Sequence, residues 1–374
     1  MKSYMKYTIL VGLVAGTGLG SAQDAKTLNV GVMYAYSAQG KNDRAFNQAM
    51  ADGMTRASQD FPVKFKEFIP LKRGVDAALE RFSKEPFDMV VGVSFEYLDL
   101  MNKTAALGTS KAYVLVDAAS DKPNVNSIIF REEEGSYMVG YLAALKTSTG
   151  SVGFVGGMNI PVIQRFEAGY TAGARAARPG VKVYSAYIGN TPAAFDNPKA
   201  AQRVAEVLKK KGVDIIFSAA GVSGNGVIEY VNGMQCLKAS ELPQGMKFTS
   251  NLYKDLPKAK TYNTKCAGDT RPMFFIGVDI NQNYLGDTDK DPKTLNHGLT
   301  SMVKNVDVAV YSAIRGLSQG NFKTGVVSLG LNEGGVGYSV DKYNGALISK
   351  GEFAKLQQVV KEVGLGNLKV PIKR

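Results

Sequence analysis

The chain is poor in the residues that carry most enzyme and metal chemistry. Its 374 residues include no tryptophan, two cysteines and a single histidine, His297. One histidine removes the commonest general base, and together with two cysteines it leaves too few soft ligands for a conventional structural zinc site. We therefore expect no metal and no cofactor, while chemistry based on carboxylates remains open.

Long hydrophobic runs are also scarce. After the first residues no apolar run approaches 18 residues, so we expect no membrane insertion of the mature protein. Residues 1–22 have the pattern of a secretory signal peptide: two lysines precede an apolar stretch at 8–20, and small residues follow at 20–22. An uncleaved interfacial anchor is the alternative. We predict a periplasmic or otherwise extracytoplasmic protein.

The charge is basic but dispersed. The chain has 45 Lys and Arg against 33 Asp and Glu, a formal charge of +12, and its longest basic run is Lys209-Lys210-Lys211. Binding to a nucleic-acid polymer normally needs basic residues clustered on one face, so we expect no such partner. The 45% hydrophobic and 21% charged composition is that of a globular protein, and the length favours two domains.

The two cysteines lie in the part of the chain that would be exported, where thiols tend to pair. We predict a disulfide between Cys236 and Cys266, with two free thiols as the alternative. The segment around them, Gly233–Pro272, contains three prolines and little periodicity. We interpret it as an insertion that the disulfide closes.

From residue 28 onward the chain alternates short β-branched runs with amphipathic runs of helical length. Continuous apolar strands that alternate with helices indicate parallel sheets covered on both faces, a doubly wound α/β architecture. The expected strands are Leu28–Ala35, Val63–Ile69, Asp88–Ser94, Ala112–Asp117, Ser151–Gly156, Val181–Ile188, Asp214–Ala219 and Phe274–Val278. The expected helices include Arg44–Ser58, Gly74–Lys84, Gly135–Lys146, Pro161–Ala177, Pro198–Lys211 and Val306–Gln319.

The residues that follow the strands are the candidates for function. In doubly wound sheets ligands bind at the carboxyl ends of the strands, near the switch point of the strand order. Two lobes that each present such an edge would form a cleft, which suits a hinged binding protein. The residues at these exits are 34–46, Ser94-Phe95-Glu96, Asp117, Gly156-Gly157-Met158, 220–224 and Asp279.

Enzyme motifs fail the test of spacing. Residues 221–225, GVSGN, lack the second glycine of a nucleophile elbow, and residues 152–157, VGFVGG, do not have the spacing of a dinucleotide-binding loop. Glu132-Glu133-Glu134 could hold a metal, but carboxylates at the start of a predicted helix more often complement its dipole. We expect no enzymatic activity.

Residues 42–47, NDRAFN, and residues 152–173, VGFVGGMNIPVIQRFEAGYTAG, begin a series of ordered matches to one family. They resemble the basic membrane protein family, the extracytoplasmic purine nucleoside-binding components of ABC transporters. Two features depart from its pattern: the lipid-acceptor cysteine of many relatives is missing, so we expect no lipid anchor, and the insertion at Cys236 and Cys266 is foreign to it. Further matches lie at 130–136, 140–144, 219–226, 276–279, 300–307 and 330–338.

The resemblance implies the type I periplasmic-binding-protein fold, with two doubly wound Rossmann-like lobes joined by three crossovers. We expect the crossovers near 128–130, 301–303 and 323–326. Residues 27–128 with 302–323 would form the N-terminal lobe. Residues 129–301 with 324–374 would form the C-terminal lobe and carry the insertion at about 233–272.

The family places a nucleoside between two aromatic rings, at positions that Phe46 and Phe195 match. The residues alone would favour Phe46 as a core residue of its helix, whereas the resemblance favours the cleft. Asp117 matches the aspartate that meets the base; a carboxylate only accepts hydrogen bonds, so it selects a purine edge that donates. Capping of the following turn is the structural alternative for Asp117. Further polar contacts are expected from Asn42, Asp43 and, more weakly, Asn47.

The resemblance assigns the sugar end to Asp279 and Lys304. Two vicinal ribose hydroxyls can donate to one carboxylate, and a nearby ammonium can donate to the remaining oxygens. A plain salt bridge between Asp279 and Lys304 is the alternative, and it is compatible with sugar binding. Gly221 and Ser223 would let the backbone approach the ligand, or would simply form a tight turn.

The sequence therefore predicts a monomeric solute-binding protein that captures purine nucleosides such as guanosine, adenosine or inosine between two lobes. Closure about a hinge would present the loaded form to the permease of an ABC importer. One alternative is the same fold with another small polar ligand, such as a sugar or a signalling molecule. Others are a secreted nucleoside-cleaving enzyme and a sensor subunit that hands its closed form to a receptor. His297 is expected to be structural.

Overall fold

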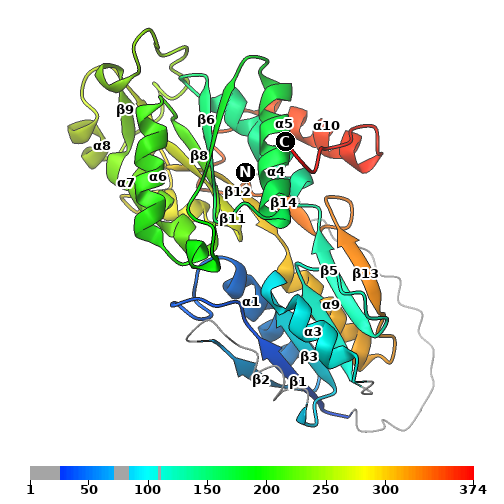
Figure 1. Cartoon of the computed structure of the whole chain (residues 1–374). Helices are drawn as coiled ribbons and strands as arrows, with labels where there is room; N and C mark the ends of the chain where they lie inside the picture. The colour runs from blue at the N-terminus through cyan, green and yellow to red at the C-terminus, as the bar shows by residue number, and fades with distance from the viewer. Residues whose placement is uncertain (1–25, 71–83, 108–110) are drawn as a thin grey trace, which may run out of the picture.

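The computed structural model describes residues 26–70, 84–107 and 111–374. The expected signal peptide, and the expected helix Gly74–Lys84 up to residue 83, lie outside these ranges. The described chain forms two lobes, one above the other in Figure 1, and it passes between them three times. Within the described ranges no helix is both long enough and apolar enough to cross a membrane.

The first lobe is built on a six-stranded parallel sheet with the order β13-β5-β4-β3-β1-β2. Helices α1 and α9 pack on one face, and α3 packs on the other, where its Met101 and Ala105 meet Tyr113 and Leu115. The strands are β1 Leu28–Met33, β2 Val63–Phe68, β3 Met89–Val93, β4 Ala112–Val116, β5 Val125–Phe130 and β13 Gly325–Leu329. The helices are α1 Phe46–Asp60, η1 Phe95–Tyr97, α3 Leu98–Ala105 and α9 Val306–Ser318.

The second lobe repeats this plan with the order β14-β12-β11-β8-β6-β7, in which only β14 is antiparallel to its neighbour. Its strands are β6 Ser151–Gly156, β7 Lys182–Tyr187, β8 Ile215–Ala219, β11 Phe274–Asp279, β12 Gly298–Lys304 and β14 Val336–Tyr338. Its α-helices are α4 Glu132–Lys146, α5 Pro161–Ala177, α6 Pro198–Lys210, α7 Gly224–Met234 and α10 Lys350–Gly364. Its short 3-10 helices include η2 Pro192–Phe195, η3 Gly221–Ser223 and η5 Asn283–Gly286.

The alternation of side chains along each strand explains why both faces are covered. In β11, Phe274 and Ile276 join the core beneath α4 and α5, whereas Phe275 joins the core beneath α6 and α7. Strands β3, β4 and β8 are buried at every residue. Strands buried on both faces are typical of parallel sheets, so the predicted doubly wound α/β fold is confirmed.

Glycine allows α4 and α5 to pack unusually closely. A Cβ atom on Gly169 of α5 would lie 2.1 Å from the carbonyl oxygen of Glu133 in α4, and one on Gly140 of α4 would lie 2.1 Å from that of Tyr170 in α5. Only residues without a side chain fit these positions. The close contact holds the start of α4 against the middle of α5, so that Glu132 lies within hydrogen-bond distance of Arg165.

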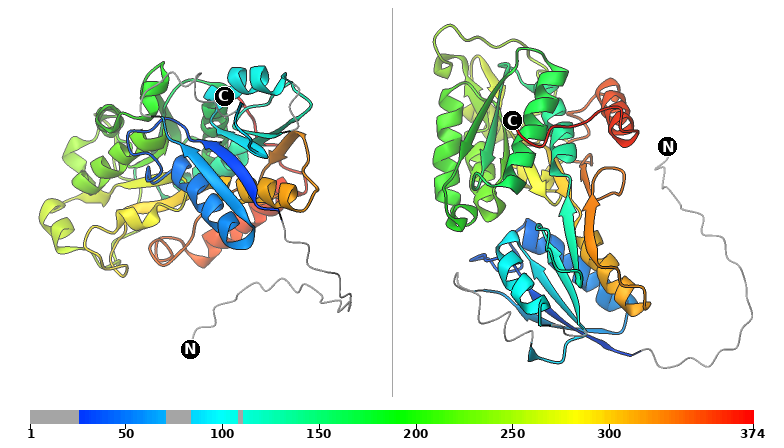
Figure 2. Two further views of the ribbon diagram at one scale, coloured as in Figure 1. Left: turned by 90° about the horizontal axis from the view of Figure 1, so that it is seen from below. Right: turned by 45° about the vertical axis from the view of Figure 1, so that its right-hand side comes forward.

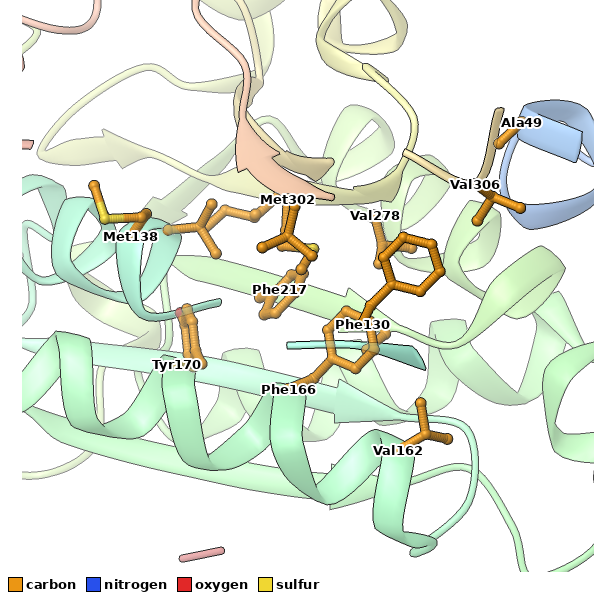
Figure 3. Close-up of a cluster of buried hydrophobic side chains, with 14 of the residues drawn as sticks. Ala49, Phe130, Met138, Val162, Phe166, Tyr170, Phe217, Val278, Met302 and Val306 are labelled. Carbon is orange, nitrogen blue, oxygen red and sulfur yellow. The ribbon is translucent and has the colours of Figure 1, made fainter. Parts of the chain in front are cut away.

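A continuous apolar core joins the crossovers to the second lobe. Phe130, the last residue of β5, lies beside Phe166 of α5 and near Val278 of β11 (Figure 3). Met302 of β12 belongs to the same core. Phe130 and Met302, which lie at the first two crossovers, are thus packed into the core of the second lobe.

One expected boundary is wrong. Strand β13 pairs with β5 from Gly325 to Leu329, so it belongs to the sheet of the first lobe and the third crossover follows Leu329 rather than lying at 323–326. Figure 2 shows this strand, in orange, beside β5. The first two crossovers follow Phe130 and Lys304, within a few residues of the expected places. The edge strand is missed because Val326 and Val327 are exposed, so it lacks the buried pattern of the other strands.

The insertion lies at the end of the second lobe that is remote from the first lobe (Figure 1). It contains β9 Cys236–Lys238, η4 Ala239–Glu241, α8 Lys260–Lys265 and β10 Thr270–Pro272. Cys236 and Cys266 form a disulfide with 6.0 Å between their Cα atoms, as predicted. His297 is buried beside this segment, and its Nδ1 lies 2.8 Å from the carbonyl oxygen of Met273. Burial lowers the pKa of His297 to about 4, which fits a structural residue.

Candidate functional site

The two lobes enclose a cavity of about 770 Å³ of non-atom space, open at its mouth. Its walls come from the carboxyl ends of β1, β3 and β4 in one lobe and of β8, β11 and β12 in the other, with the start of α5 and η2. The switch points of the two sheets lie between β1 and β3 and between β6 and β8. The cavity therefore lies where doubly wound sheets bind ligands.

Seven of the nine predicted site residues line this cavity. Asn47, the weaker candidate, lines it as well and uses its amide nitrogen to hold the carbonyl oxygens of Ala35 and Gly40 at 3.0 and 3.1 Å. Segments up to 261 residues apart in sequence, from Asp43 to Lys304, thus converge as expected. The seven are Asp43, Phe46, Asp117, Phe195, Gly221, Asp279 and Lys304.

Two predicted residues do not line the cavity. Asn42 is exposed at the surface of the loop before α1. Ser223 is fully buried; its hydroxyl donates to the carbonyl oxygen of Ala194 and accepts from the backbone N–H of Asn197, both at 2.7 Å. Ser223 thus fixes the turn that carries Phe195. Both residues lie next to segments that line the cavity. Closeness in sequence alone could not show that their own side chains lie outside it.

Phe46 and Phe195 enter the cavity from opposite lobes. Phe46 is the first residue of α1, and Phe195 ends η2. Gly157 leaves room for Phe195, because a Cβ atom on residue 157 would lie 2.3 Å from the Phe195 ring. Phe95 of the first lobe meets Phe195 edge-on, with 6.3 Å between ring centroids and 60° between ring planes. Phe95 was recognised only as a strand-exit residue, and it adds a further aromatic wall.

Asp43 lines the cavity, but its carboxylate is occupied by the start of α1. Oδ1 accepts the backbone N–H groups of Ala45 and Gln48 at 2.9 and 3.0 Å, and Oδ2 accepts that of Asn47 at 3.0 Å. Burial raises the pKa of Asp43 above its usual value, and the three N–H groups oppose that shift. The residue therefore anchors the helix that presents Phe46.

Lys304 lies at the centre of the cavity floor with 2% of its side chain exposed. Its Nζ contacts Asp117 Oδ1 at 2.5 Å and Glu132 Oε1 at 3.1 Å, and it lies 5.1 Å from the centroid of the Phe46 ring. The acids around it raise the pKa of Lys304, against the effect of burial, so it is an ammonium ion. Among the described residues Asp279 forms no salt bridge with Lys304, which was the alternative expected from the sequence. Lys304 forms its salt bridges with Asp117 and Glu132 instead.

Glu132 was missed as a site residue because it appeared only as a helix-dipole acid. It is fully buried, and its Oε2 accepts a hydrogen bond from Nε of Arg165 at 2.6 Å. Glu133 is also buried, and burial raises its pKa to about 7. The described residues contain no group of three or more histidine, cysteine and acidic residues arranged to hold a metal ion. The acidic triplet takes part in ion pairs: Glu132 with Arg165 and Lys304, Glu133 with Arg165, and Glu134 with Arg131.

Asp279 is the acid with the least support from the protein. It is 7% exposed, it lines the cavity, and the described residues act on its carboxylate through burial and charge rather than through a hydrogen bond. Burial raises the pKa of Asp279 to about 7; Lys304 opposes this shift, while Asp117, Asp43 and Glu132 add to it. The cavity is therefore rich in acceptors and poor in donors, and a ligand that donates hydrogen bonds to Asp279 would stabilise its ionised form.

Three hydrogen bonds join the lobes at the rim of the cavity. Nε2 of Gln282 donates to the carbonyl oxygen of Arg44 at 2.6 Å, and Nδ2 of Asn225 donates to that of Asp43 at 3.3 Å. The backbone N–H of Ala38 donates to the side chain of Asp196 at 3.1 Å. The structure is thus a closed form, in which both lobes contact whatever occupies the cavity.

Comparison with solved structures agrees with this architecture. The chain is similar to a solute-binding protein of an ABC transporter system from Aeropyrum pernix, with a TM-score of 0.72, 26% identity and 92% and 94% of the two chains covered. It shares its fold, at 13% identity and a TM-score of 0.54, with GanP, a glucose-galactose binding protein from Geobacillus stearothermophilus. The fold is that of type I periplasmic-binding proteins, and the protein is an extracytoplasmic solute-binding protein of an ABC transporter.

Sequence comparison defines the family. Residues 30–235 match the family described as Bmp, ABC transporter substrate-binding protein PnrA-like. The chain is 30% identical to a CD4+ T-cell-stimulating antigen of Listeria monocytogenes, over 89% of this chain and 86% of that one. It is 28% identical to the ABC transporter nucleoside-binding protein BmpA of Lactococcus lactis, over 89% and 88%. The chain belongs to the Bmp family, whose members bind solutes for ABC transporters and are not enzymes.

Proposed function

We propose that the protein captures purine nucleosides in the interlobe cavity and delivers them to the permease of an ABC importer. The observation that carries this proposal is the pairing of aromatic walls with a buried carboxylate, Asp279, in one cavity between the lobes. An aromatic base with a hydroxyl-bearing sugar fits both features. The nucleoside-binding relative from Lactococcus lactis supports the same ligand class.

The base would lie between Phe46 and Phe195. A purine has two π faces, and stacking on aromatic side chains contributes on the order of 1–3 kcal/mol per base. Asp117 would accept hydrogen bonds from the donor edge of the base, while its Oδ1 keeps the contact with Lys304. Burial raises the pKa of Asp117, and the Lys304 ammonium opposes that shift, so the ion pair favours the ionised form that accepts hydrogen bonds. Gly221, which has a left-handed φ of 53°, gives the ligand access to the backbone at the end of β8.

The ribose would lie against Asp279. Two vicinal hydroxyls donating to its carboxylate would replace the missing hydrogen bonds and select ribose over 2′-deoxyribose. Lys304 would act on the sugar mainly through its charge, since Asp117 and Glu132 already engage its ammonium.

Charge favours nucleosides over nucleotides. Asp117, Glu132 and Asp279 act on Lys304, and Asp43 lines the same cavity, so a phosphate would add negative charge to a site that already holds an excess of it. A neutral ligand with several donors meets no such penalty.

Delivery would follow closure. The nucleoside would bind one lobe of an open form, contacts from the other lobe would stabilise the closed form, and the permease would recognise that form. We propose further that the mature protein acts as a monomer. We also propose that it has no lipid anchor, because its two cysteines, Cys236 and Cys266, lie far from the expected cleavage site. Labelling cells with a radioactive fatty acid, followed by fractionation, would test the absence of an anchor.

Ligand carried through purification provides the direct test. Denaturing extraction and mass spectrometry would identify it, and calorimetry would then compare guanosine, adenosine, inosine, 2′-deoxyguanosine, guanine and ribose. We expect micromolar or tighter binding of a ribonucleoside, about −8 kcal/mol, and no binding of free ribose. Binding of a sugar in preference to every nucleoside would refute the proposal.

A further inference from the structure

Gln282 does not line the cavity, yet its side chain joins the two lobes. It is 3% exposed and directly precedes η5, three residues after Asp279. Its Oε1 accepts the backbone N–H of Val278 at 2.9 Å inside the second lobe, and its Nε2 donates to the carbonyl oxygen of Arg44 at 2.6 Å in the first lobe. The amide of Gln282 therefore makes one hydrogen bond within the second lobe, through Oε1, and one to the first lobe, through Nε2.

The bond to Val278 closes a tight turn around Asp279. Asp279 has a left-handed φ of 65°, which is unusual for a residue with a side chain, and the N–H of Ile280 donates to the carbonyl oxygen of Val278 at 2.8 Å. Such a backbone persists only where its surroundings hold it. Gln282 provides part of that hold, and its own N–H is fixed by Ser301 Oγ at 2.9 Å.

Space for this arrangement is provided in β11. A Cβ atom on Gly277 would lie 2.7 Å from Oε1 of Gln282 and 2.6 Å from Oγ of Ser301. A larger residue at position 277 would push the Gln282 side chain away from the strand. The amide can fold back onto the strand end only because residue 277 is glycine.

On the other side of the cavity, Arg44 lies in the loop that carries Asp43 and leads into Phe46. Arg44 also has a left-handed φ, of 57°. Its carbonyl oxygen can meet Gln282 only when the lobes are together, because the two residues belong to different lobes. The other two cross-lobe hydrogen bonds at the rim, from Asn225 and Ala38, do not involve the turn around Asp279.

We infer that Gln282 is a positioning residue that couples closure of the lobes to the orientation of Asp279. In the closed form the Arg44 carbonyl fixes the amide of Gln282, the amide holds the turn, and the turn directs Asp279 toward the sugar. In the open form the amide keeps only its bond to Val278. This inference rests on the proposed function in one respect: it takes the ligand to be a nucleoside, and Gln282 controls how long that ligand is retained.

Two substitutions separate the two halves of this role. Gln282→Glu, measured at about pH 8 where the acid is ionised, keeps an acceptor for the Val278 N–H and loses the donor to Arg44. Gln282→Ala loses both. Asn232→Asp is the matched control, because its amide donates at 2.7 Å to the carbonyl oxygen of Leu285 within the second lobe only.

Guanosine binding to the three variants would be followed by calorimetry and by stopped-flow dissociation. For Gln282→Glu we expect affinity about tenfold weaker, mostly through faster dissociation. Asn232→Asp should bind guanosine like the unaltered protein. Unchanged dissociation from Gln282→Glu, or an equal loss in Asn232→Asp, would overturn the coupling.

A ligand-independent measurement keeps the two proposals distinguishable. If the unaltered protein binds no nucleoside, the proposed function is wrong, and hydrogen exchange of the Val278 amide in the ligand-free protein still tests the turn. We expect Gln282→Ala to lose protection there and Gln282→Glu to keep it. Equal protection of Val278 in Gln282→Ala and the unaltered protein would show that Gln282 does not hold the turn.

Discussion

Acidification should weaken nucleoside binding through Asp279. Burial raises the pKa of this residue to about 7 in the closed cavity, with Asp117, Asp43 and Glu132 adding to the shift and Lys304 opposing it. Sugar hydroxyls donate to the ionised carboxylate, so ligand binding favours the deprotonated form. The contribution of Asp279 to affinity is therefore complete above about pH 7 and is lost as the pH falls through that value.

The magnitude follows from one titrating group. Each pH unit below the pKa reduces the ionised fraction about tenfold, which corresponds to about 1.4 kcal/mol of binding free energy. Guanosine should thus bind about tenfold more weakly at pH 6, and about a hundredfold more weakly at pH 5, than at an alkaline plateau. Calorimetry across this range, in buffers of different ionisation enthalpy, would also count the proton that binding releases.

Two variants serve as controls for this experiment. Asp279→Asn should bind weakly at every pH, because it removes the titrating group. Glu133→Gln should keep the full pH dependence, since burial raises the pKa of Glu133 to about 7 as well but its side chain does not line the cavity. Affinity that stays constant or rises on acidification, or a slope that persists in Asp279→Asn, would refute the sugar assignment.

Lys304→Met should destabilise the protein by about 3–5 kcal/mol in chemical denaturation, because it leaves Asp117 and Glu132 buried without their cation; an unchanged midpoint would contradict the ion-pair network. Phe195→Ala should weaken guanosine binding by about 1–3 kcal/mol in calorimetry, and no loss would argue against stacking. Removing the disulfide with Cys236→Ser and Cys266→Ser should cost about 2–4 kcal/mol of stability in urea unfolding. Guanosine affinity should stay unchanged, because the insertion lies at the far end of the second lobe. A large loss of affinity would mean that the insertion acts on the cavity.

Sequence reasoning located the cavity partly by a general rule about parallel sheets and partly by the resemblance to a family, which supplied Phe195 and Lys304. The apolar strands and the helices between them repeat locally, so the positions of most strand ends could be assigned without knowledge of the tertiary structure. Asp117 follows β4 and Asp279 ends β11, and these strands hold equivalent places in the two sheets. Strand ends at one edge converge in any doubly wound fold, which is why residues from both lobes were found together.

The partners of the charged residues could not be assigned in the same way. The sequence offered Asp279 as the partner of Lys304, whereas the ammonium contacts Asp117 and Glu132. Each of these contacts joins residues more than 150 positions apart, and a difference of a few ångströms decides which carboxylate is nearest. Local patterns contain no information at that scale.

Thus the sequence by itself determined the α/β fold, the strand ends that meet at the cavity and their aromatic and acidic character, because hydrophobic periodicity and residue type are local properties. Only the tertiary structure decided that β13 completes the first sheet, that Ser223 supports Phe195 rather than the ligand, and that Gln282 joins the lobes. These features depend on the distances between segments remote in sequence, and such distances are set when the two lobes pack and close.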